Sequence, residues 1–483
     1  MRDDFWNKDR ADFQIARIAM ENFRCFSGLA LELNFEPRKI SRNGELKTVS
    51  PLTVIVAKNG MGKTTILDAI RIAYGTFTSE FSYKSSVTFH SRDIRIDKDK
   101  ISQCFPATID ALGDIDKSWY EWIRTVRKEG QHTRMWVEDK EKENATDTLN
   151  IKEMGGNPFK TFIKKFKEAE EWKEILTLPI IASYGTNRLW KKTTRKEKKR
   201  NLVTNRTWGY SSCLDAASNY SESFEWLTDS IIVRLNEKQV GIQKNQTIND
   251  LLDAIESALK IVLEPEGYTP PLHLDPFFQE LAVVQGKEWG KGISVPVSQM
   301  SDGVKAVFFM VADIAFRCAK LNPQFKKNAA ELTPGIVLID EIDLHLHPSW
   351  QQSVLDTLQL AFPKIQFIVT THSPQVVSSV PKECVRIIDN GEVIPFSTPT
   401  QGVDISDILA GIFGTDPIPQ NSEIAKKLNL LHTMLAEGLG DSAEWNALYQ
   451  ELETYYGKDY PPLLGTKAHR EFLKKMKAGE CNA

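Results

Sequence analysis

Apolar runs of strand length recur along the chain. Two of them, 54–56 and 336–339, contain no polar residue, and a third, 365–371, is mostly apolar. Such runs are typical of strands in a parallel sheet that is covered on both faces. Between residues 66 and 73, directly after the first run, apolar residues recur at helical spacing. The pattern therefore predicts an α/β fold with a mainly parallel sheet.

The hydrophobic pattern along the whole chain predicts four regions. Lobes over 1–79 and 179–400 carry the apolar runs, and we expect a mainly helical insertion over 80–178 between them. The helical stretch 157–174 lacks the sustained heptads of a coiled coil, which favours a compact insertion over a long arm. The fourth part, 401–483, contains three helical patterns (404–414, 423–438 and 444–457), and we expect this helical region to dock a partner or a second protomer.

Composition and charge disfavour several classes of protein. The 483 residues carry a formal charge of only -3, so the chain as a whole has no strong attraction to nucleic acid. Its six cysteines lie far apart without a C-x-x-C pair, which disfavours both a zinc ribbon and a disulfide framework. The apolar stretch 306–316 is interrupted by Asp313 and followed by Arg317. We therefore expect a cytoplasmic protein without a membrane span.

A glycine-rich turn follows the first apolar run. Gly60 and Gly62 remove side chains that would keep an anion from the backbone N–H groups, and Lys63 adds a positive charge. The following helix directs its positive end at the same place. This is the Walker A pattern except that Ala57 replaces its first glycine. The residues expected to surround the phosphates of ATP are Lys58, Asn59, Gly60, Met61, Gly62, Lys63, Thr64 and Thr65.

Acidic residues end the second apolar run. Asp340 and Glu341 follow the strand 336–339, at the sheet edge where the phosphate loop is expected. Asp340, together with the hydroxyl of Thr64, suits Mg²⁺. Glu341 is placed to polarise the water that attacks the γ-phosphate. His372 ends the third run, and we expect it to reach the γ-phosphate, so that Lys63, Glu341 and His372 form the catalytic set.

A long apolar helix begins after Ser301. Ser301 is a suitable N-cap, and Asp302 and Gly303 would form the first turn with free N–H groups. Taken alone this is a helix start, and most helix starts bind nothing.

The motifs together resemble a known family. In chain order, "KNGMGKTT", "MSDGVK", "LIDEIDLHLHP" and "TTHSP" resemble the Walker A, signature, Walker B with D-loop, and His-switch elements of ABC-type ATPases of the SMC and OLD kind. The segment 17–33 is similar to the strand that opens such heads. The segments 178–188 and 210–227 are similar to parts of ATPases of bacterial antiphage defence, in particular the PtuA family of Septu systems, which also occur in some retrons. The resemblance covers about residues 13–415 and implies a three-layer ATPase head.

The resemblance implies composite sites. In such ATPases the signature helix of one chain caps the nucleotide of another, so Ser301, Asp302 and Gly303 would complete the site of a partner in a head-to-tail homodimer or a higher assembly. Asp343, in the D-loop, would contact the opposite site. His345 and His347 lack a third ligand for a metal, which favours structural roles. The glutamine of the Q-loop has no clear position.

A basic segment spans 191–206, with eight lysine or arginine residues against one glutamate. It is either a solvated loop or a contact for the phosphates of DNA or RNA. The candidates for nucleic-acid contact are Lys191, Lys192, Arg195, Lys196, Lys198, Lys199 and Arg200.

Residues 403–483 contain no D-x-D pair for a Toprim nuclease, so we expect any nuclease to be a separate chain. The resemblance implies a PtuB-like HNH nuclease as that partner, and leaves open a retron reverse transcriptase complex. Two alternatives remain: an SMC/RecF-like ATPase of DNA repair or maintenance, and an ATP-sensing scaffold with little turnover. A transporter motor is disfavoured because "DEIDLHLHP" departs from the transporter D-loop.

Overall fold

The computed structural model describes residues 13–477 apart from ten gaps. The gaps are 43, 82–86, 98, 130–133, 140–156, 187–204, 216–220, 242–245, 287–291 and 417–420. The chain divides into two compact units, Met1–Ile405 and Ser406–Ala483.

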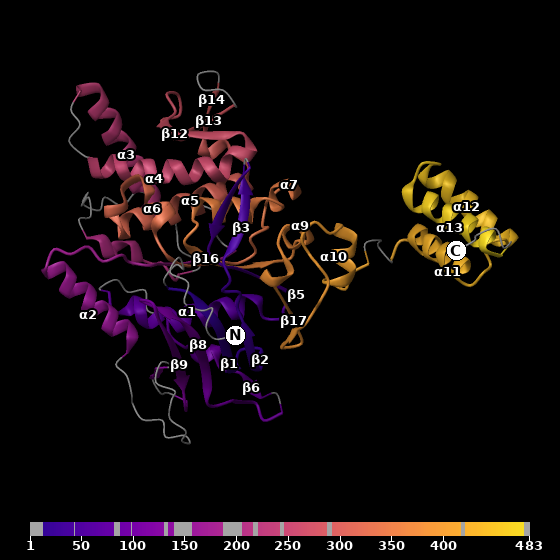
Figure 1. Cartoon of the computed structure of the whole chain (residues 1–483), viewed down its shortest axis with the longest axis horizontal. Helices are drawn as coiled ribbons and strands as arrows, with labels where there is room; N and C mark the ends of the chain where they lie inside the picture. Colours follow the sequence, from indigo (N-terminus) through magenta and orange to yellow (C-terminus); the bar gives the residue numbers. More distant parts are fainter. Residues whose placement is uncertain are drawn as a thin grey trace. The chain divides into compact units, whose positions relative to one another are not determined.

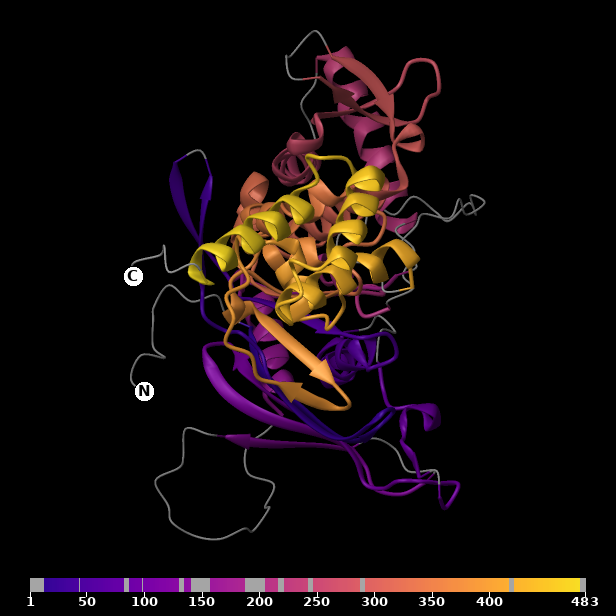
Figure 2. The same cartoon turned by 90° about the vertical axis from the view of Figure 1, so that its right-hand side faces the viewer.

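A six-stranded sheet forms the centre of the first unit. Four of its strands, β5, β11, β15 and β16, are buried along their whole length, as their apolar sequences predict. All neighbouring strands are parallel except the last pair, so the α/β fold with a mainly parallel sheet is confirmed. The order is β11 (Ile180–Tyr184), β15 (Gly335–Ile339), β16 (Ile365–Thr371), β5 (Leu52–Ala57), β17 (Val385–Asp389) and β18 (Glu392–Ile394); Figure 2 shows the last two as orange arrows.

Helix α1 (Lys63–Ser79) lies between the parallel sheet and a second, antiparallel sheet (Figure 1). Trp122 Nε1 and Arg124 Nη1 of this sheet donate hydrogen bonds to the carbonyls of Ala73 and Ile72 in α1, each at 3.1 Å. The helix that carries Lys63 is therefore fixed on both sides. The strand order is β10 (Arg134–Asp139), β9 (Ser118–Val126), β8 (Ala107–Ile115), β1 (Ile15–Phe23) and β2 (Phe26–Glu32).

The expectation of a mainly helical insertion over 80–178 is wrong for the part that the structure describes. Strands β8, β9 and β10 lie there, with the short β6 (Ile96–Asp97) and β7 (Ser102–Gln103), beside one helix, α2 (Pro158–Glu171). Strand β8 alternates strictly between buried and half-buried positions, the period-2 pattern of a strand with one covered face. Residues 140–156 lie outside the described residues.

Helices cover the other face of the parallel sheet and carry a small additional sheet (Figure 1). Helix α5 contacts β11 and packs against α4. The helices are α3 (Ser221–Val240), α4 (Gln246–Leu263), α5 (Asp302–Leu321), α6 (Ala329–Leu332), α7 (Pro348–Gln351), α8 (Val354–Ala361) and α9 (Pro374–Ser378). Helix α10 (Ile405–Gly411) begins at the last residue of the first unit, and its other residues belong to the second. The remaining strands are the hairpin β3 (Arg38–Arg42) with β4 (Glu45–Val49), and the sheet β12 (Tyr268–Leu274), β13 (Leu281–Gln285) and β14 (Ile293–Pro296).

The second unit is helical and has its own apolar core. It contains α11 (Glu423–Ala436), α12 (Ala443–Tyr456) and α13 (Pro461–Lys477). The buried core of the unit comprises Leu428, Leu431, Met434, Trp445, Leu452 and Leu463.

Within the ranges that the structure describes, no helix is both long and apolar enough to cross a bilayer.

Candidate nucleotide site

The loop between β5 and α1 has the backbone of a phosphate cradle. Gly60 and Gly62 adopt φ values of +78° and +91°, a left-handed conformation that glycine adopts without a steric penalty. Lys63 is buried, and its Nζ donates to the carbonyls of Ala57, at 2.8 Å, and Lys58, at 3.3 Å. Burial lowers the pKa of Lys63, and the carboxylates that follow β15 oppose this shift. The ammonium thus lies between the loop and these acids.

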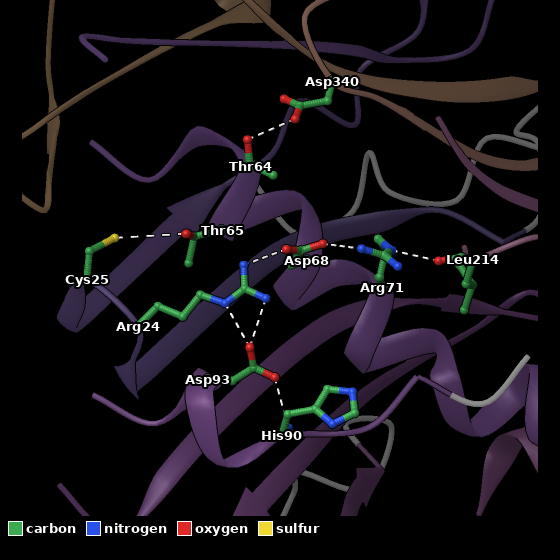
Figure 3. Close-up of polar contacts among 10 residues, drawn as sticks. All are labelled: Arg24, Cys25, Thr64, Thr65, Asp68, Arg71, His90, Asp93, Leu214 and Asp340. Carbon is green, nitrogen blue, oxygen red and sulfur yellow. Dashed lines mark hydrogen bonds and ion pairs between the residues drawn. The ribbon is translucent and has the colours of Figure 1, made fainter. Parts of the chain in front are cut away.

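The turn between β1 and β2 packs directly on this loop. A β-carbon at Gly62 would lie 2.4 Å from Cζ of Phe26 and 2.8 Å from Sγ of Cys25. The same Sγ lies 4.0 Å from the hydroxyl of Thr65 (Figure 3). Because 2.4 and 2.8 Å are far inside van der Waals contact for a β-carbon, a side chain at Gly62 would displace the turn or the loop.

Thr64 and Asp340 meet at the start of α1 (Figure 3). The hydroxyl of Thr64 donates to Oδ2 of Asp340 at 2.8 Å, and the hydroxyl of Thr370 donates to Oδ1 at 2.6 Å. The backbone N–H of Asp340 donates to the carbonyl of Tyr184 at 2.8 Å. The carboxylate is therefore fixed from α1 and β16, and the backbone of Asp340 is fixed from β11.

The oxygen pair of Thr64 and Asp340 fits Mg²⁺. One hydroxyl and one carboxylate are the hard oxygen donors that this ion takes beside water and phosphate. The observation that supports the fit is their direct contact, which brings both donors to one point at the mouth of the phosphate loop. A bound Mg²⁺ would neutralise phosphate charge there.

Glu341 begins the turn after β15 in a strained conformation. Its φ of +47° is left-handed, which is uncommon for a residue with a side chain and is often found at functional sites. Its N–H donates to the hydroxyl of Thr370 at 2.8 Å. Thr370 therefore positions both Asp340 and Glu341.

The next carboxylate, Asp343, is bound to the end of β16. Its Oδ1 accepts the hydroxyl of Thr371 at 2.6 Å and the N–H of His372 at 3.3 Å. Burial, followed by the positive charge of Lys63, lowers the pKa of His372 below its ordinary value. At neutral pH His372 is therefore an uncharged imidazole that can accept as well as donate a hydrogen bond.

The start of α5 lies beside the loop that contains Asp343. Ser301 caps the helix by accepting the N–H of Val304 at 3.4 Å, and Asp302 pairs with Lys305 at 3.3 Å. A β-carbon at Gly303 would lie 2.2 Å from the carbonyl oxygen of His345. Within one chain, the structure thus places the first turn of α5 against the loop that contains Asp343, and it places Asp340, Glu341 and His372 near Lys63.

Several neighbours of the site are absent from the sequence-based prediction. Thr370 and Thr371 form two polar positions at the end of an otherwise apolar strand, a signal available in the sequence. The network in Figure 3 has no local signal: Arg24, from the β1–β2 turn, bonds Asp68 of α1 at 2.5 Å and Asp93 at 2.8 Å. Asp68 also pairs with Arg71 of the same helix, and its contact with Arg24 fixes α1 to the turn.

The remaining predicted positions are the two histidines after Asp343 and the basic segment. His347 caps α7 and its Nδ1 lies 2.7 Å from the hydroxyl of Ser349, while His345 adopts a φ of +63° in the D-loop. The basic candidates from Lys191 to Arg200 lie outside the described residues, so their contact with nucleic acid stays a prediction.

Comparison with known proteins identifies the family. Residues 14–377 match the AAA ATPase domain. A retron Ec83 probable ATPase of Escherichia coli is 27% identical and aligns over 95% of this chain and 86% of its own length. The Septu protein PtuA of Bacillus mycoides (strain KBAB4) is 28% identical over 49% of this chain and 33% of its own length. A solved SMC head, bound to the C-winged helix domain of ScpA, covers 79% of this chain with a TM-score of 0.42 and 17% identity. The chain belongs to the AAA ATPase domain family and resembles the ATPases of retron and Septu systems.

Proposed function

We propose that this chain is the ATP-hydrolysing subunit of an antiphage defence complex and that it controls a partner HNH nuclease through ATP-dependent association of two heads. The observation that carries the proposal is the cluster of Lys63, Thr64, Asp340, Glu341 and His372 at one sheet edge. The names of the retron and Septu relatives support the defence context.

Each residue of the cluster has a distinct task in hydrolysis. The loop amides and the Lys63 ammonium bind the phosphates, and Thr64 with Asp340 would hold Mg²⁺. Glu341 takes a proton from the attacking water, a role worth roughly 10² to 10⁴ in rate. The neutral His372, held by Asp343 through its backbone N–H, is placed to bond the γ-phosphate or the water.

The second half of each site comes from another protomer. Ser301 and Gly303 stand at the N-terminus of a 20-residue helix, so its positive dipole end adds to their N–H groups. The packing of Gly303 against the backbone of His345 places this helix end beside the predicted D-loop, which supports a head-to-tail dimer in which the signature of each chain meets the phosphate loop of the other.

The second unit offers a docking face for the nuclease. Leu464, Ala468, Phe472 and Met476 recur every four residues along α13 and are exposed, Phe472 at 53% and Met476 at 56%. Such a row packs into the groove of an amphipathic partner helix. The helix carries five lysine or arginine residues against one glutamate, so an acidic rim on the nuclease is the complementary charge.

Phage infection of cells that carry the complete operon tests the proposal. We expect the wild type to lower phage plating, and Lys63→Ala and Glu341→Gln to abolish protection. In purified complex, Glu341→Gln should bind ATP and lose roughly 10² to 10⁴ of the turnover. Equal slow turnover in wild type and variant would identify a nucleotide-binding scaffold, and hydrolysis stimulated by DNA without protection from phage would favour a repair or maintenance ATPase.

Docking on α13 has a separate test. Phe472→Glu with Met476→Glu should release the nuclease encoded in the same operon during purification while ATP turnover stays unchanged. The matched control is Phe277→Glu in the first unit, where the phenylalanine is 89% exposed and lies far along the chain from α13. A nuclease that remains bound to the double variant, or an operon without a nuclease, contradicts this part.

A further inference from the structure

Asp313 is a buried junction in the middle of α5. Only 3% of the surface of Asp313 is exposed. Oδ2 accepts the phenol hydroxyl of Tyr184 at 2.8 Å and Nε of Arg317 at 2.7 Å, and Oδ1 accepts the hydroxyl of Ser223 at 2.7 Å. A buried carboxylate with a cation and two hydroxyls is well compensated, and its geometry is well defined.

Arg317 extends this junction to the segment before α3. Its Nη1 donates to the carbonyls of Gly209 and Ser211 at 2.8 and 2.9 Å. Beside Asp313 lies a small, mainly apolar cavity between α3, α4 and α5, so the ion pair has an apolar neighbourhood in which electrostatic interactions are strong. The cavity is lined by Ser223, Phe224, Leu227, Ile255, Phe309, Ala312, Asp313 and Phe316.

Tyr184 joins the junction to the acidic end of β15. It is the last residue of β11 and pairs in register with Ile339 of β15. Its backbone carbonyl accepts the N–H of Asp340 at 2.8 Å, while its side-chain hydroxyl bonds Asp313. One residue therefore connects the backbone of the Mg²⁺ candidate Asp340 to the helix that begins at Asp302.

Helix α5 is held at two places relative to the catalytic edge. Gly303, in its first turn, packs against the backbone of His345, and Asp313 lies ten residues further on, about 15 Å along the helix. Because a helix is stiff over this length, fixing Asp313 fixes the direction in which Ser301 and Gly303 point.

We infer that Tyr184 and Asp313 are positioning residues that couple the two ATP sites of the dimer, an inference that rests on the proposed head-to-tail arrangement. In that arrangement Asp340 and Glu341 act on the nucleotide of their own chain, and Ser301 and Gly303 act on the nucleotide of the partner. A displacement at the end of β15 at one site passes through Tyr184 to α5, and so to the other site.

Tyr184→Phe tests the coupling because it removes one hydroxyl and leaves the ring, Asp313 and Arg317 in place. We expect the Kd for ATP to stay within about twofold, kcat to fall about fivefold or more, and the Hill coefficient of hydrolysis to fall to about 1. The matched control is Tyr210→Phe. Tyr210 is also buried, and its hydroxyl donates at 2.7 Å to the carbonyl of Pro179, which directly precedes β11.

The outcomes separate coupling from a structural role. If both variants lose the same thermal stability but only Tyr184→Phe loses kcat and cooperativity, the inference stands. If Tyr184→Phe retains wild-type kcat and Hill coefficient, or changes them only as much as Tyr210→Phe does, the inference is wrong although the ATPase assignment survives. A wild-type Hill coefficient of 1 also overturns it, whereas a wild-type chain without hydrolysis contradicts the proposed function itself.

Discussion

The hydroxyl of Thr64 donates a 2.8 Å hydrogen bond to Asp340, across 276 residues of sequence. The two residues follow β5 and β15, and β16 lies between these strands in the sheet. Parallel strands deliver their carboxyl ends to one edge, so the phosphate loop and the acidic turn meet there.

Thr64→Val should strongly reduce Mg²⁺-dependent hydrolysis. Valine has the shape of threonine but no hydroxyl, so the oxygen pair with Asp340 is lost, and we expect turnover to fall by about 10² or more. Thr64→Ser keeps the hydroxyl and should stay within about threefold of wild type. Steady-state hydrolysis over a range of Mg²⁺ concentrations measures both; wild-type turnover in the valine variant would show that Thr64 contributes no ligand.

Gly303→Ala should destabilise the first unit and slow hydrolysis. Its β-carbon would lie 2.2 Å from the carbonyl oxygen of His345, which is backbone and cannot rotate away. Overpacking of this kind costs about 1–3 kcal/mol. Chemical denaturation followed by tryptophan fluorescence, with turnover measured in parallel, tests the prediction. Gly28→Ala is the control because no atom lies within 4 Å of a β-carbon at that position, and equal stability of the two variants would contradict the close contact.

His372 should make stability depend on pH. Its folded-state pKa lies below the ordinary 6.5, so the unfolded chain binds more protons as the pH falls through 6.5 towards the folded value. The wild type should therefore lose more Tm than His372→Gln between about pH 7.5 and pH 5.5. The same change at the exposed His469 is the control for histidine loss. A parallel decline in wild type and His372→Gln would contradict the pKa shift.

The part of the site carried by local patterns could be predicted from sequence. Apolar strands followed by the phosphate loop with Lys63, by Asp340 and by His372 indicate both the sheet and the edge that carries the candidate site, because a buried strand must be apolar and polar residues gather where it ends. Ser301 is recognisable as an N-cap for the same local reason.

The missed parts depend on distant contacts. Tyr184 and Asp313 lie 129 residues apart, and neither has a neighbouring motif that indicates the hydrogen bond between them. Strand β9 mixes charged and aromatic residues, and only its pairing with β8 and its packing on α1 decide that it is extended. Secondary structure with such a mixed sequence follows tertiary packing more than local preference.

Mixing two inactive variants tests the central claim, that each ATP site combines Lys63 of one chain with Ser301 of another. Lys63→Ala and Ser301→Arg should each be inactive alone. In a mixed head-to-tail dimer one site carries both changes and the other carries none, so random mixing restores up to about a quarter of wild-type turnover. A mixture no more active than its separate components would contradict the shared site.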